Sequence, residues 1–164
     1  MTAILRPVTA LLIATAILML GGGLQGVLLP IRAKLEGFAD FHVGLMGAGY
    51  YAGLLAGCLL APAIIGRVGH IRAFTAFTAL LCTTPLLHAI WLSPVSWIGL
   101  RIINGLCFAG LLLVIESWLA SASDAKTRGH VLGVYALVHL VVVTIGMQFV
   151  NIAAPTGFEL FSLN

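Results

Sequence analysis

The 164-residue sequence is too apolar for a soluble domain. Hydrophobic residues make up 61% of it and charged residues only 8%, with a mean hydropathy of +1.14, whereas soluble domains carry about 25% charged residues. The net charge of +3 comes from eight Lys and Arg against five Asp and Glu, which is too sparse for a nucleic-acid-binding surface. The sequence therefore predicts an all-α integral membrane protein, with the lipid bilayer and not nucleic acid among its partners.

Five apolar stretches are each long enough to cross the ~30 Å hydrocarbon core as a helix, which takes about 20 residues. They are residues 8–29, 43–65, 73–92, 97–119 and 131–150, and a sixth helix is expected to begin near residue 158. The first stretch ends before Pro30. Its alternative, a cleaved signal peptide, is disfavoured because the apolar run is long and no A-x-A-like site follows it. We expect one domain, an antiparallel bundle of five transmembrane helices plus the start of a sixth.

The second stretch contains the sequence GYYAGLLAG, which spaces Gly49, Gly53 and Gly57 four residues apart. Residues at this spacing lie on one face of a helix. A stripe of small residues lets another helix backbone approach closely, so that van der Waals contact stabilises the pair inside the membrane. Two interpretations remain open: a static packing contact, or a surface on which helices slide during a conformational cycle.

The fourth stretch, RIINGLCFAGLLLVIESWLA at residues 101–120, carries charges near its two ends. Arg101 and Glu116 would lie about 22 Å apart on an ideal helix, so they cannot pair with each other. One interpretation is that both side chains snorkel to the membrane surface. The other is that Arg101, Asn104 and Gly105 line a water-filled cavity, where intramembrane ionisable residues are usually found, with Ala109 continuing the same face. Glu116 is then a further cavity candidate, as a gate or a proton site.

The other polar residues inside the apolar stretches are Gln25, His88, His139 and Gln148. Tyr135 and His139 share a helix face, and a histidine with a pKa near ~6.5 can relay protons. The alternative is a neutral histidine that is hydrogen-bonded to a neighbouring helix. The three cysteines show no metal-ligand spacing, and no protease signature is present. The sequence therefore predicts no enzyme, no metal and no cofactor, and leaves proton coupling open.

Several motifs resemble the major facilitator superfamily of secondary transporters. RIINGLCFAG is similar to the superfamily's fourth-helix motif, R-x-x-x-G-x-x-x-A, and GRVGHIR is similar to its loop between helices two and three. A closer resemblance is to the bacterial YcaD-type branch. It rests on RPV near the start, GLMGAGYYAGLLAGCLL, ESWL and RGHVLGVYALV.

The resemblance implies two six-helix halves with a substrate cavity between them and alternating access by rocking. It places Arg67, Gly69 and Arg72 in the basic inner-loop motif, and Arg101, Gly105 and Ala109 in the fourth-helix motif. The chain would then be an N-terminal part of a secondary active transporter for an unidentified small solute, inactive without the C-terminal half. The alternative function is a small membrane interaction or assembly subunit that uses the Gly49, Gly53 and Gly57 face.

Two features depart from the superfamily pattern. Gly66 stands where the loop motif usually has an acidic residue, and the fifth stretch lacks the G-P pair of the antiporter motif. The sequence therefore gives no support for a drug/proton antiporter.

Basic residues near the ends of the stretches predict the orientation. With the N-terminus in the cytoplasm, Arg6, Arg67, Arg72, Lys126 and Arg128 lie inside, whereas Arg32 and Lys34 lie outside. Trp91 and Trp97 would flank the second outer loop as part of an aromatic belt. We expect a multi-pass protein of the bacterial inner membrane with a cytoplasmic N-terminus.

Overall fold

A computed structural model describes residues 2–121, 123–124, 127–155 and 157–162 of the chain, and side chains from Ile13 onward. The described part is helical: α1 (Thr2–Leu35), α2 (Asp40–Val68), α3 (His70–Ile90), α4 (Pro94–Ser121), α5 (Arg128–Gln148), the 3-10 turn η1 (Phe149–Asn151) and the short α6 (Glu159–Ser162). Five of these helices are long and apolar enough to span a membrane. The prediction of an all-α membrane protein is confirmed.

Most helices extend past the limits that hydropathy sets. α2 begins at Asp40 and ends at Val68, and α1 continues through Pro30 to Leu35. The interpretation of Pro30 as a helix end is therefore wrong. Proline removes one backbone hydrogen bond but is tolerated in membrane helices, where neighbouring helices compensate. The charged residues that bound the apolar stretches therefore do not mark the ends of these helices.

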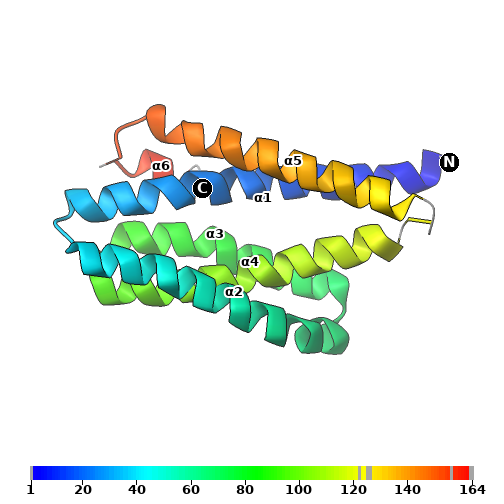
Figure 1. Ribbon diagram of the computed structural model, residues 1–164, viewed down its shortest axis with the longest axis horizontal. Coiled ribbons are helices and arrows are strands. Elements are labelled where there is room, and N and C mark those ends of the chain that lie inside the picture. Colours follow the sequence, from blue (N-terminus) through cyan, green and yellow to red (C-terminus); the bar gives the residue numbers. More distant parts are fainter. Residues whose placement is uncertain (1, 122, 125–126, 156, 163–164) are drawn as a thin grey trace.

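Consecutive helices run in opposite directions, and they form two groups (Figure 1). α1 packs mainly on α5, and α2 packs mainly on α4, which also carries α3. We call these the α1–α5 pair and the α2–α4 pair. The short α6 lies near the end of the bundle at which residues 36–39 connect α1 to α2, here called the 36–39 end. The opposite end, where Gly69 connects α2 to α3, is called the Gly69 end.

Glycine residues bring the helices of each pair into backbone contact. A Cβ atom on Gly53 would overlap the carbonyl oxygen of Ile102, and one on Gly105 would overlap that of Tyr50. Gly57 lies against Leu106 and Ala109. The predicted glycine stripe of α2 is therefore covered by α4 and does not face lipid.

The α1–α5 pair repeats this arrangement. A Cβ atom on Gly23 would overlap the carbonyl oxygen of Val143, and one on Gly146 would overlap that of Leu20. In both pairs each glycine meets the residue three positions before the partner's glycine. The two pairs therefore cross in the same way.

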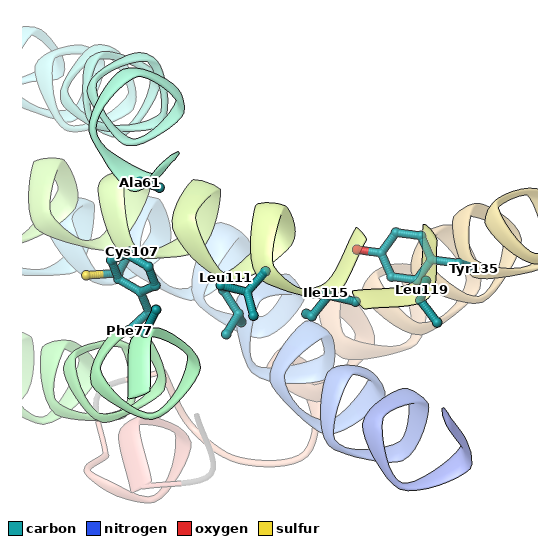
Figure 2. Close-up of a cluster of buried hydrophobic side chains, with 9 residues drawn as sticks. Ala61, Phe77, Cys107, Leu111, Ile115, Leu119 and Tyr135 are labelled. Carbon is teal, nitrogen blue, oxygen red and sulfur yellow. The ribbon is translucent and has the colours of Figure 1, made fainter. Parts of the chain in front are cut away.

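α4 is the centre of the larger apolar cluster, which lies towards the Gly69 end. In Figure 2, Ala61 of α2, Phe77 of α3 and Tyr135 of α5 approach the α4 residues Cys107 to Leu119 from three sides. A second cluster at the 36–39 end joins α1, α2 and α4 to α6 through residues that include Leu28, Met46, Trp97 and Phe161. The cavity described below lies between the two helix pairs.

Trp97 belongs to this second cluster and not to an aromatic belt. Its side chain is fully buried, and its Nε1 donates a hydrogen bond to the carbonyl oxygen of Trp91 at 2.8 Å. Its ring packs edge-on against Phe38 and His88. The sequence interpretation of Trp97 as an interfacial anchor is wrong, because the indole donor is satisfied inside the bundle. Trp91 is exposed.

Candidate functional site

A cavity of about 470 Å³ lies between the α1–α5 pair and the α2–α4 pair, and it is here called the main cavity. Its lining extends from Pro30 and Val43, near the 36–39 end, to Leu18 and His139 deeper in the bundle. It includes four of the polar residues that the sequence singles out: Gln25, Arg101, Asn104 and His139. Residues distant in the sequence and on three different helices therefore meet at one site.

Arg101 is the charged residue of this lining. Its guanidinium carbon lies 4.2 Å from the centre of the Tyr50 ring, a cation–π contact across the α2–α4 pair. The side chain is half-buried, and no ion pair of the described residues involves it. The structure thus places Arg101 in the lining of the cavity, beside Tyr50.

Gln25 and Asn104 supply amide groups to the same lining. Gln25 is 3% exposed, and its Nε2 has no hydrogen-bond partner among the described residues. The side chain of Asn104 is fixed by a hydrogen bond, which its Nδ2 donates to the Thr84 hydroxyl at 3.1 Å. Thr84 in turn donates to the Leu81 carbonyl oxygen. Asn104 thus ties α4 to α3, whereas the buried amide nitrogen of Gln25 has no such partner among the described residues.

His139 lies at the junction of two hollows. It lines the main cavity and also a more open groove between α4 and α5, which Glu116 and Tyr135 line with it. Its ring packs edge-on against Phe108 on one side and Tyr135 on the other. The structure therefore places Glu116 in the groove and not in the main cavity, but joins the two sites through His139.

Gly105 is placed differently from the other candidates. The sequence puts it among the cavity residues, whereas the structure puts it in the α2–α4 crossing, against the Tyr50 carbonyl. The reason is that Arg101 and Gly105 differ by about 40° around an ideal helix, and Gly105 falls on the side that faces α2. A side chain at position 105 would separate the helices rather than enter the cavity.

The inner-loop motif forms the connection between α2 and α3. Arg67 is in the last turn of α2 and Arg72 in the first turn of α3, both exposed. Gly69 joins them with a φ of 84°, in the region that favours glycine. Among the described residues neither arginine has an ion pair, in keeping with the missing acidic residue at position 66. Lys126, counted in the orientation argument, lies outside the described residues.

Sequence reasoning missed several residues that shape the site. Tyr50 and Phe108 form aromatic walls, and Gly23 and Gly146 make the α1–α5 crossing. A signal existed for Gly23, which ends a run of three glycines, but Gly146 is an isolated glycine in an apolar helix. No group of His, Cys, Asp and Glu suited to a metal ion occurs among the residues that were placed.

These observations define the class of protein: a multi-pass α-helical membrane protein with a polar-lined cavity between two helix pairs. The chain is 29% identical over 150 residues to MFS-type transporters named YcaD from Escherichia coli O45:K1 (strain S88), O81 (strain ED1a) and O157:H7 (strain EC4115). The similarity covers 89% of this chain but 38% of each relative. No family model matches the sequence, and no solved structure matches it. The resemblance to the YcaD-type branch of the major facilitator superfamily is confirmed.

Proposed function

We propose that this chain forms the substrate-cavity wall of a secondary active transporter for a small solute. The observation that carries the proposal is the cavity between the two helix pairs, which Gln25, Arg101, Asn104 and His139 line. Polar residues are costly inside a membrane and mark solute or ion pathways. The similarity to MFS-type transporters supports the same function.

The chain spans 38% of the length of the relatives it matches. In a transporter built from two halves, the solute binds at the interface between them. We therefore propose that the residues described here supply one wall of the site, and that transport needs the C-terminal half as well. Alone, the 164 residues should bind a solute without moving it across a membrane.

The alternative function is an assembly subunit that binds a partner through the α2 glycine face. That face is already occupied within the chain. Gly49, Gly53 and Gly57 are buried against α4. A partner helix would have to displace α4, which is the most extensively buried helix of the bundle.

A chimera tests the proposed function. This chain would replace the matching 150 residues of the E. coli O157:H7 relative, and the purified protein would be reconstituted into liposomes with a mixture of small metabolites outside. We expect at least one solute to accumulate inside, and Arg101→Ala to abolish its uptake while leaving membrane insertion intact. Arg101→Lys should retain part of the uptake, because lysine keeps the charge but loses the planar fork.

The unaltered relative and the 164-residue chain alone are the matched controls. If the relative transports a solute and the chimera, folded to the same extent, transports none, the proposal fails. Uptake by the chain alone would show that no second half is needed.

We further propose that the groove of Glu116, Tyr135 and His139 couples transport to protons. A carboxyl group and an imidazole that line one groove can exchange a proton through water. Glu116→Gln removes the ionisable group at similar size, so transport by the chimera should become less dependent on pH. Glu159→Gln, an exposed carboxyl on α6, is the control. An unchanged pH profile in Glu116→Gln would remove Glu116 from the proposal.

We also propose a bacterial inner membrane location with the N-terminus in the cytoplasm. At the 36–39 end, Arg32 pairs with Glu36 at 2.6 Å and Lys34 pairs with Asp40. At the Gly69 end, Arg67, Arg72 and Arg128 make no ion pair with described residues, and such basic ends favour the cytoplasm. Reporter fusions after Val68 and Thr127 should report cytoplasm, and fusions after Glu36 and Pro94 the outside. The inverse pattern would overturn the orientation.

A further inference from the structure

The charge of the main cavity is unbalanced. Its lining, as described, contains the guanidinium of Arg101 and no Asp or Glu. Tyr50 covers one face of the guanidinium at 4.2 Å, which leaves the N–H groups around its edge for other partners. A cation in a low-dielectric surrounding is stabilised by a nearby negative charge. The described residues that line the cavity do not provide that charge.

The cavity also contains an unused donor. Gln25 lines the cavity, and its Nε2 atom is buried and lacks a hydrogen-bond partner among the described residues. Buried amide groups are nearly always hydrogen-bonded. An amide nitrogen donates, so the missing partner is an acceptor. Gln25 on α1 and Arg101 on α4 therefore present donors from opposite walls of one cavity.

The remaining lining sets the size and character of a ligand. A volume of about 470 Å³ falls in the range of sites for small molecules. Leu29, Met46 and Phe108 line it with apolar surface, which suits a hydrophobic or aromatic body. A carboxylate matches the planar edge of a single guanidinium through two parallel hydrogen bonds.

We propose that this cavity binds a small organic monocarboxylate with an apolar or aromatic body, its carboxylate held by Arg101 and Gln25. The proposal rests on the proposed function and specifies its substrate class. Cations are disfavoured by repulsion from Arg101. For the same reason, a neutral analogue of equal size should bind more weakly than the anion.

Thiol labelling tests the proposal in the 164-residue chain, purified in nanodiscs of zwitterionic lipid so that no lipid carries net charge. Cys58, Cys82 and Cys107 would be replaced by Ala, and Gly47→Cys introduced as the probe. Gly47 lines the cavity, and a Cβ atom there has open space. Gly44→Cys, one turn earlier on α2 with equally open space but outside the lining, is the matched control.

Anionic and cationic methanethiosulfonate reagents of similar size would be compared at each position. A single positive charge nearby should favour the anionic reagent at position 47 by roughly 5-fold relative to position 44. Arg101→Gln should abolish this preference. Benzoate should slow labelling at position 47 but not at 44, whereas benzylammonium and benzyl alcohol should protect much less.

Gln25→Met is the second variant, and it should weaken protection by benzoate while keeping the charge preference. Labelling at 47 with no preference for the anionic reagent, or a preference that survives Arg101→Gln, would overturn the anion site and leave a water-filled cavity intact. Absence of labelling at 47 by both reagents, in protein that is labelled at 44, would overturn the aqueous cavity and the proposed function with it. Protection by inorganic phosphate as strong as by benzoate would overturn the assignment to an organic carboxylate.

Discussion

The α2–α4 pair and the α1–α5 pair both cross where glycines bring the two helix backbones into contact. They differ in how far this close contact continues along the helices. Each pair contains a reciprocal couple of glycines that meet the partner's backbone: Gly53 and Gly105 in one, Gly23 and Gly146 in the other. In the α2–α4 pair the contact continues through Gly57 to Ala109. α4 buries eleven of its residues, whereas α5 buries two.

The difference shows what a close crossing does for a site. A backbone contact fixes the rotation of both helices, and so fixes which side chains face the cavity. Arg101 immediately precedes Ile102, whose carbonyl faces Gly53, so its direction is set by the more extensive pair. His139 lies one turn before Val143, whose carbonyl faces Gly23, and its helix has less to hold it. We infer that the α2–α4 pair forms a wall of the cavity whose helices are fixed in position, whereas α5 forms a wall that can shift.

The largest effect is expected from Gly53→Leu. A leucine side chain would have to displace the backbone of Ile102, and overpacking of this kind costs about 3 kcal/mol. Unfolding in mixed micelles with increasing SDS measures the decrease in the free energy of unfolding. Gly44→Leu, on the same helix with open space around it, should change stability by less than about 0.5 kcal/mol. Equal effects of the two variants would contradict the backbone contact.

A smaller effect is expected from Gly146→Leu, about 1 to 2 kcal/mol. The overlap with the Leu20 carbonyl is just as close, but α5 has few other buried side chains and can shift outward. The shift should widen the cavity and accelerate thiol labelling at Gly47→Cys. If Gly146→Leu destabilised the protein as much as Gly53→Leu, α5 would be as firmly held as α4.

The smallest effect is expected from Asn104→Ala, which removes the hydrogen bond to Thr84 between α4 and α3. Side-chain hydrogen bonds between membrane helices contribute about 0.6 kcal/mol on average. A double-mutant cycle with Thr84→Ala measures the coupling free energy between Asn104 and Thr84. A coupling near zero would mean that this hydrogen bond does not help to hold α4 against α3.

How far the sequence predicts this protein can be argued from particular residues. Hydropathy finds all five long helices because spanning the hydrocarbon core requires an unbroken apolar run. It misplaces the end of α1, since a proline inside a membrane helix resembles a helix end. Gln25, Arg101, Asn104 and His139 could be nominated because a polar group in an apolar run is rare. Tyr50 and Phe108 could not, since aromatic residues in such a run are common.

The sequence by itself determined the number of spans, the polar residues within them and the close-packing face of α2. These are properties of one segment: apolar length, residue type and a four-residue spacing. Only the tertiary structure decided that the α2 face meets α4, that Gly23 meets α5, and that Trp97 turns inward. It also decided that Gln25 and Arg101 face one cavity while Gly105, four residues from Arg101, does not. Those outcomes depend on the rotation of each helix against a distant partner, and contacts between distant segments leave no periodic pattern in the sequence.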